Sequence, residues 1–152
     1  MSNYKENEYT ILIVDDLPEN IYAFEAVLSE ENYILLSALN GQKALSLALK
    51  YHPHLILLDV QMPDIDGFEV AEILKKTEVT KDIPVVFITA ISKDVQYINR
   101  GYELGAENYI FKPIDPDMLR IKIRHVLKYH EYIKEMSKHE LRREELRQRI
   151  LE

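Results

Sequence analysis

Hydrophobic residues gather in five short runs along the chain, and segments with helical spacing lie between them. The runs span residues 10–14, 33–39, 54–59, 83–90 and 107–113. Runs of this length that are rich in Val, Ile and Leu are typical of β-strands, and the run 54–59 alternates so little that both its faces must be buried. Helical spacing of apolar residues follows the first run, at Ile21, Phe24, Val27 and Leu28.

Residues typical of helix starts mark the segments between the runs. Asn40 caps one helix, and Ser92 begins another. Asp115 is an N-cap followed by Pro116 at the first helical position. A further helix is expected from about Gly67 to Lys76. Strands that alternate with helices in this way predict an α/β domain, (βα)5, in which a doubly wound parallel sheet of five strands is covered by helices on both faces.

Polar side chains stand at the carboxyl ends of four of the five runs, and they are Asp15, Asp16, Asp59, Thr89 and Lys112. The carboxyl ends of parallel strands meet at one edge of the sheet, where ligand sites form in folds of this class. A carboxylate beside a core is costly unless a partner neutralises it or a function requires it. We therefore expect these five side chains to form one site.

The chemistry of this set favours a divalent cation and a phosphoryl group. Three crowded carboxylates raise one another's pKa, and a cation removes that conflict. Oxygen ligands without His or Cys favour Mg²⁺ or Mn²⁺ over zinc, and an ion held by few carboxylates keeps positions open for phosphate oxygens. The ammonium of Lys112 and the hydroxyl of Thr89 would stabilise charge on a transferring phosphoryl group. Asp59 would then be the nucleophile that becomes an aspartyl phosphate.

Four motifs, in this order along the chain, carry a resemblance to a known family: ILIVDD, LILLDVQMPDIDG, VVFITA and GAENYIFKP. With them the sequence resembles the receiver domain of two-component response regulators, over about residues 8–128. The resemblance implies a flavodoxin-like receiver fold, and we expect a receiver domain at residues 1–128 with a C-terminal helical extension at 129–152.

The resemblance also implies roles for individual residues at the acidic site. Asp59 resembles the phosphoacceptor, and Asp15 and Asp16 resemble the pair that binds Mg²⁺, with Asp16 as the direct ligand. Gln61 stands where a main-chain carbonyl completes the metal shell. Lys112 resembles the lysine that binds the phosphate, and its peptide bond to Pro113 is expected to be cis.

Two further pairs of residues follow from the same resemblance. Thr89 resembles the switch hydroxyl that moves toward the phosphate, and Tyr109 resembles the switch aromatic that turns inward with it; packing alone would equally explain a tyrosine at position 109. Gln61 and Ile91 stand at the two positions that set the lifetime of the phosphate. Because Ile91 offers nothing polar to an attacking water, we expect slower dephosphorylation than in a receiver with polar groups at both positions.

The implied function is two-component signal transduction without turnover of an external substrate. A histidine kinase or phosphotransfer protein would supply the phosphoryl group, and the modified domain would act on a fused output domain or a partner. Two alternatives remain. One is an interaction module on the same fold that does not use phosphate. The other is a flavodoxin-like cofactor binder, although VDDLPEN after the first strand offers two carboxylates and no glycine for a phosphate.

The composition limits the possible cellular location and partners of this domain. The 152 residues contain no cysteine, which removes disulfides and thiolate zinc sites and fits a cytoplasmic protein. No apolar run reaches membrane-spanning length, so we expect no membrane partner. The net charge of −7 argues against direct binding to nucleic acid.

The charge of the last segment differs from that of the rest. Residues 1–125 carry 12 Lys and Arg against 20 Asp and Glu, whereas residues 126–152 carry 7 against 6. No Gly or Pro follows Pro116, so one long helix is expected. Its seam steps by three and four through Tyr129, Tyr132, Met136, His139, Arg143, Leu146 and Ile150. This pattern is compatible with a homodimeric coiled coil, with a solvated helix, or with a linker to an output domain. The stretch His139 to Arg142 resembles part of a histidine-kinase phosphoacceptor box, but the Thr-Pro that would follow is replaced by Arg143 and Glu144.

Overall fold

The computed structural model describes residues 8–90, 95–103 and 108–151 of the chain. Its strands are β1 (Tyr9–Val14), β2 (Tyr33–Ala38), β3 (Leu55–Asp59), β4 (Val85–Thr89) and β5 (Asn108–Phe111). They form one sheet in the order β2-β1-β3-β4-β5, and every neighbouring pair is parallel. The predicted parallel five-stranded sheet is therefore confirmed, and every strand begins and ends within two residues of the predicted positions.

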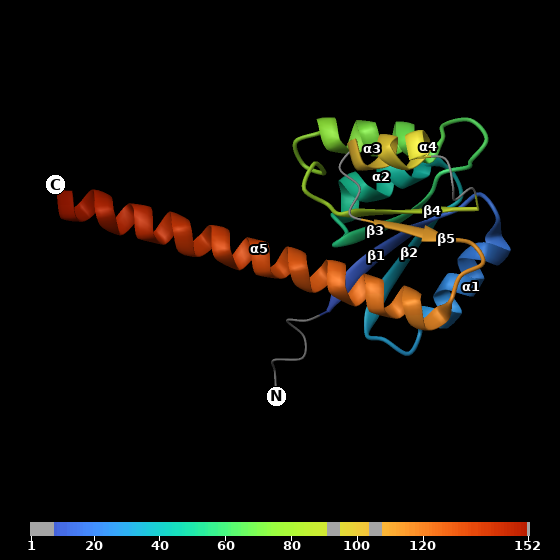
Figure 1. Ribbon diagram of the computed structural model, residues 1–152, viewed down its shortest axis with the longest axis horizontal. Coiled ribbons are helices and arrows are strands. Elements are labelled where there is room, and N and C mark those ends of the chain that lie inside the picture. Colours follow the sequence, from blue (N-terminus) through green and yellow to red (C-terminus); the bar gives the residue numbers. More distant parts are fainter. Residues whose placement is uncertain (1–7, 91–94, 104–107, 152) are drawn as a thin grey trace.

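Five helices connect and follow the strands: α1 (Pro18–Leu28), α2 (Gly41–Tyr51), α3 (Gly67–Lys76), α4 (Val95–Glu103) and α5 (Pro116–Leu151). Figure 1 shows α2, α3 and α4 on one face of the sheet and α1 with the first part of α5 on the other. Because both faces are covered, β3 and β4 are buried at every position.

Two apolar layers lie on the two faces of the sheet. Alternate residues of the same strand enter different layers, as Leu12 and Ile13 of β1 do. The layer with Leu12 contains Phe68 and Leu74 of α3, and the layer with Ile13 contains Ile123 of α5. Both faces of the sheet are covered by packed apolar residues, and the charged residues at the strand ends are attached to these buried strands.

Two helix starts carry the capping residues that the sequence indicated, Asn40 and Asp115, whereas Ser92 lies outside the described residues. The side chain of Asn40 accepts a hydrogen bond from the backbone N–H of Lys43 at 2.8 Å. The carboxylate of Asp115 accepts hydrogen bonds from the N–H groups of Asp117 and Met118, at 2.9 and 3.3 Å. These bonds satisfy N–H groups that have no partner inside the helix.

Helix α5 is one continuous helix of 36 residues that runs far beyond the sheet (Figure 1). Its first part is anchored by Leu119, Ile123, Val126 and Leu127, which are buried. The expected domain boundary at residue 128 falls inside this helix, where the helix has no break. In the part of the chain that the structure describes, no helix combines the length and apolar character that crossing a membrane requires.

Candidate functional site

Three carboxylates meet at the carboxyl edge of the sheet. Val14 pairs with Leu58 in the register of β1 and β3, so the residues that follow them, Asp15 and Asp59, lie side by side. Oxygen atoms of Asp15, Asp16 and Asp59 all lie within 4.8 Å of one another. Asp15 and Asp59 are buried, with 1% and 3% of their surface exposed, and Asp16 is partly exposed. The sheet therefore brings together the three carboxylates that the sequence singled out.

Asp15 is held by donors from three directions. Its Oδ1 accepts the backbone N–H of Leu17 at 3.0 Å, and the amide of Asn20 donates to Oδ1 and Oδ2 at 3.2 and 3.3 Å. The ammonium of Lys112 lies 3.3 Å from Oδ2. A buried carboxylate with this many donors is oriented as well as neutralised. Asn20 belongs to the site although the sequence analysis did not identify it.

Asp59 is less fully satisfied than Asp15. The backbone N–H of Gln61 donates to Oδ1 at 3.2 Å, and Nζ of Lys112 lies 3.8 Å from Oδ2. The chain turns sharply here, and Gly67 passes the backbone of Asp59 so closely that a Cβ at this glycine would lie 2.4 Å from the Asp59 carbonyl oxygen. Only glycine allows this approach, which explains the glycine at the start of α3.

The environment raises the pKa of the Asp59 carboxyl from 3.8 to about 6. Burial is the main cause, because it disfavours the charged form, and the negative charge of Asp15 adds to it. Lys112 and the Gln61 N–H act in the opposite direction but do not compensate. The site therefore holds more negative charge than its own ammonium neutralises, which is the condition under which a cation is attracted.

The donor set fits a hard divalent cation. All three side chains offer carboxylate oxygens, and within the described residues no His or Cys belongs to the group. Oxygen-only sets of this kind suit Mg²⁺, Mn²⁺ or Ca²⁺ and disfavour zinc. Gln61 adds its main chain at the rim, with its side chain exposed.

Thr89 and Lys112 approach the acidic group from the neighbouring strands. Thr89 is the last residue of β4 and is fully buried, and it directly follows Ile88, which pairs with Asp59. The backbone N–H of Lys112 donates to the Thr89 carbonyl at 2.9 Å. The peptide bond between Lys112 and Pro113 is cis. All five residues singled out at the strand ends are therefore at this edge.

Tyr109 occupies an inward position under α4. It is 2% exposed, its hydroxyl donates to the carbonyl of Ile98 at 3.0 Å, and its ring packs against Phe87 at 5.5 Å between centroids. A Cβ at Gly101 would lie 1.8 Å from the Tyr109 hydroxyl, so the missing side chain makes room for the ring. Ile91, the second residue of the expected phosphate-lifetime pair, lies outside the described residues.

Comparison with known proteins agrees with this arrangement. The sequence matches the response regulator receiver domain family over residues 11–124. The response regulator PleD of Caulobacter vibrioides is 41% identical over 130 residues, which are 86% of this chain and 28% of PleD. The DNA-binding dual master transcriptional regulator RpaA of Synechocystis is 35% identical over 129 residues, which are 85% of this chain and 53% of RpaA. The chain thus spans about half or less of the length of these curated relatives.

Solved structures show the same fold. The N-terminal domain of a response regulator receiver protein from Methanoculleus marisnigri is 37% identical and superposes with a TM-score of 0.65. The match covers 78% of this chain and 96% of that domain.

Proposed function

The chain belongs to the response regulator receiver domain family, and from this membership and the geometry of the acidic edge we propose that Asp59 accepts a phosphoryl group. Receiver domains are the signalling modules of two-component systems, and phosphotransfer to an aspartate is their general function. The observation that carries the assignment to Asp59 is its position: it is the buried carboxylate at the end of β3, beside Asp15 and 3.8 Å from the ammonium of Lys112.

The residues around Asp59 have separate tasks in the proposed reaction. A carboxylate oxygen of Asp59 attacks phosphorus, and the bond from phosphorus to the donor breaks with its electron pair returning to the donor. If the donor is the phosphohistidine of a kinase, that leaving atom is a ring nitrogen. Lys112 stands 3.8 Å from Asp59 and neutralises charge on the phosphoryl oxygens, and the buried hydroxyl of Thr89 donates to one of them.

The proposed metal ion is Mg²⁺ or Mn²⁺, held by Asp15, Asp16, Asp59 and the main-chain carbonyl of Gln61. When bound, the ion supplies positive charge to the phosphoryl oxygens. Asn20 and the Leu17 N–H keep the Asp15 carboxylate pointing to the site. The carboxylate of Asp59 reacts only in its ionised form, so its raised pKa makes both metal binding and phosphoryl acceptance weaker below about pH 6.

The proposed partners are a histidine kinase or phosphotransfer protein as donor, and an output domain or second protein as target. Thr89 and Tyr109 would report the phosphate to the face formed by α4, β5 and α5, in a two-state equilibrium. In this structure Tyr109 is already buried, so the proposed change would begin from or end in this inward position.

The test is the intact mass of the protein after incubation with Mg²⁺ and acetyl phosphate. The unmodified sequence should gain a single phosphoryl group, and Asp59→Asn should gain none. Asp64→Asn is the matched control, because Asp64 is an exposed aspartate in the same loop and outside the acidic group. Modification of Asp59→Asn to the same extent, or no modification of a wild type that still binds Mg²⁺, would overturn the assignment.

A further inference from the structure

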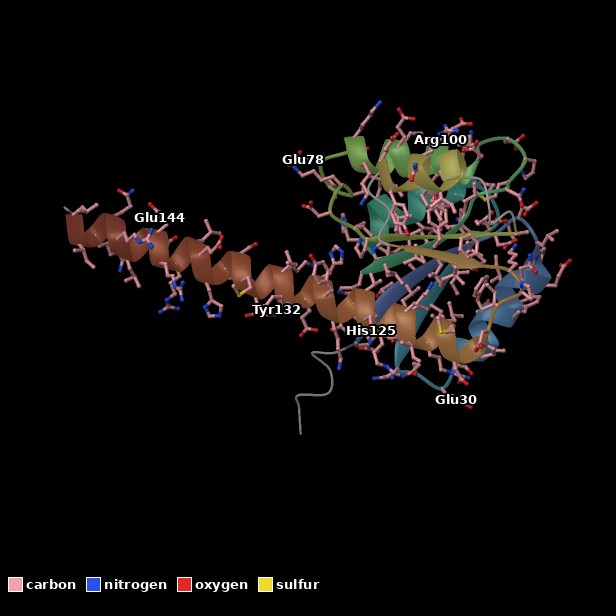
Figure 2. All side chains as sticks on the ribbon, in the orientation of Figure 1. Glu30, Glu78, Arg100, His125, Tyr132 and Glu144 are labelled. Carbon is pink, nitrogen blue, oxygen red and sulfur yellow. The ribbon has the colours of Figure 1, made fainter. Side chains whose placement is uncertain are left out.

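The outer side of α5 carries exposed apolar residues along the part that leaves the receiver body. Tyr129, Tyr132, Met136, Leu146 and Ile150 are between 42% and 82% exposed. Helical geometry places them on the side of α5 away from the buried stripe that ends at Leu127, and Tyr132 also lines a groove beside Tyr9 and Tyr33. Figure 2 labels Tyr132 and Glu144 on this projecting segment. A helix with an exposed apolar stripe is stabilised when a second surface covers it.

The stripe has the spacing of a coiled-coil seam. Its positions step by four and three in alternation: His125, Tyr129, Tyr132, Met136, His139, Arg143, Leu146 and Ile150. The charges of the residues on either side of the seam decide which orientation of a second helix is electrostatically favourable. The three polar or charged seam residues, His125, His139 and Arg143, add a second constraint, because each must face a compatible residue.

A parallel pair of identical helices through this seam places like charges together. Each seam residue then faces its own copy, so Arg143 meets Arg143 and His139 meets His139. At the flanks, Glu135 faces Glu140 of the second copy, and Arg142 faces Arg147. Every charged flank contact in this orientation is repulsive.

An antiparallel pair removes these conflicts in one register. With Met136 opposite His139 of the second copy, Arg143 falls opposite the ring of Tyr132, a cation–π arrangement. The remaining seam contacts join Tyr129 to Leu146 and His125 to Ile150.

The flanks support the same register. Glu135 now faces Arg142 of the second copy, twice by symmetry, and these central contacts are attractive. The like-charged Lys128 and Arg149 face each other only at the two ends of the pair. Sliding one copy by a heptad in either direction brings Glu135 or Arg142 opposite its own copy.

We propose that the projecting part of α5 is a dimerisation segment that binds the same segment of a second copy in antiparallel orientation. The occupant is selected by charge complementarity, and the interaction does not depend on phosphoryl acceptance at Asp59. The segment from His125 to Ile150 is about 38 Å long at 1.5 Å per residue. The two receiver bodies therefore lie at opposite ends of the helix pair, and each helix end reaches the body of the other copy.

Charge reversals distinguish the two orientations. Glu135→Arg should weaken the antiparallel dimer about fivefold to thirtyfold, as should Arg142→Glu, because each turns two attractive contacts into repulsive ones. The double variant should restore the affinity. In a parallel dimer each single reversal would instead strengthen binding, since the introduced arginine would face Glu140 and the introduced glutamate would face Arg147. Glu145→Arg is the control, on the side of the helix away from the seam.

The dissociation constants are measured by sedimentation equilibrium on the full chain, with circular dichroism to check that each variant keeps its helix content. Single cysteines give a second readout, because the chain has none of its own. A mixture of Tyr129→Cys and Leu146→Cys chains should form mixed disulfides. A monomeric wild type, tighter binding by Glu135→Arg, or disulfides only between identical variants would each overturn the proposal.

Discussion

The two edges of the sheet both hold titratable groups with shifted pKa values, but these groups differ in burial and in the consequences of the shift. At the carboxyl edge, burial and Asp15 raise the pKa of Asp59 to about 6. At the amino edge, burial and a hydrogen bond to Glu131 of α5 raise the pKa of the Tyr9 phenol to about 12. His54 packs edge-on against the Tyr9 ring at 5.3 Å, and burial together with the charge of Lys134 lowers its pKa.

The different pKa values at the two edges show how the same effect of burial acts on a carboxyl, a phenol and an imidazole. Burial favours the neutral form in every case, but the starting pKa decides whether the result falls within the working pH range. A carboxyl that ionises near pH 6 can change its charge when a proton or a cation arrives. A phenol that ionises near pH 12 stays neutral, so Tyr9 acts as a fixed donor that joins β1 to α5. One edge is reactive, and the other is structural.

The largest expected effect comes from removing the charge of the reactive edge. Asp59→Asn should raise the free energy of unfolding at pH 7 by about 1–3 kcal/mol, because the buried charge that the fold disfavours is gone. The pKa of Asp59 is higher in the folded state than the ordinary value of 3.8 expected in the unfolded chain. The folded state therefore binds more protons than the unfolded state between about pH 4 and 6. The Asp59 carboxyl should therefore add stability to the wild type as pH falls through this window, and the stability advantage of the variant over the wild type should vanish below pH 4.

Urea unfolding curves at pH 4, 5.5 and 7 measure this difference. Asp64→Asn, in the same loop but exposed, should show no comparable gain. Added Mg²⁺ should narrow the gap at pH 7, since only the wild type keeps all three carboxylates for the ion. A variant that is less stable than wild type at pH 7 would mean that Lys112 already neutralises Asp59, and the contrast between the two edges would fail.

The sequence was sufficient to predict the reactive edge because that edge follows from topology. Strands that alternate with helices make a parallel sheet, and a parallel sheet places Asp15, Asp59 and Lys112 at one end whatever the details of packing. Their types then limit the chemistry. The contacts of Asn20 with Asp15 were not predicted, because they depend on the direction of a side chain in the first turn of α1. The inward position of Tyr109 depends likewise on the space that Gly101 leaves in α4.

The structural edge was not predictable for a related reason. Tyr9 and Glu131 are 122 residues apart, and their contact depends on the angle at which α5 crosses the sheet. No pattern along the chain encodes that angle. Tyr33 and Arg124 line the same groove as Tyr9 and Glu131, and Arg124 forms an ion pair with Glu31 at 2.9 Å. Several contacts together therefore fix the position of α5.

A smaller effect is expected from the structural edge. Tyr9→Phe should lower the free energy of unfolding by about 1 kcal/mol, because it removes the hydrogen bond to Glu131 but keeps the ring against His54. The loss should be the same from pH 5 to pH 9, since the phenol stays neutral throughout. Urea unfolding across this range tests it, with Tyr22→Phe as the control because Tyr22 is 69% exposed. A loss that depends strongly on pH would show that the amino edge also titrates.

The smallest expected effect is a change of stability with pH that has opposite signs at the two edges of the sheet. Because the pKa of His54 is lower in the folded protein than its ordinary value of 6.5, the unfolded chain binds more protons just below pH 6.5. His54 should therefore cost stability as pH falls through that value, whereas Asp59 adds stability as pH falls below 6. In His54→Asn the amide oxygen can still accept the N–H of Thr10, which the ring nitrogen Nδ1 accepts at 3.0 Å in the wild type. Between pH 7.5 and 5.5, the wild-type melting temperature should fall relative to that of His54→Asn, while His52→Asn, at the C-cap of α2, should follow the wild type. The Asp59 contribution is common to all three proteins and cancels in the comparison. If the melting temperature of the wild type instead rises relative to that of His54→Asn as the pH falls, the folded state takes up protons at both edges, and the contrast between the edges fails.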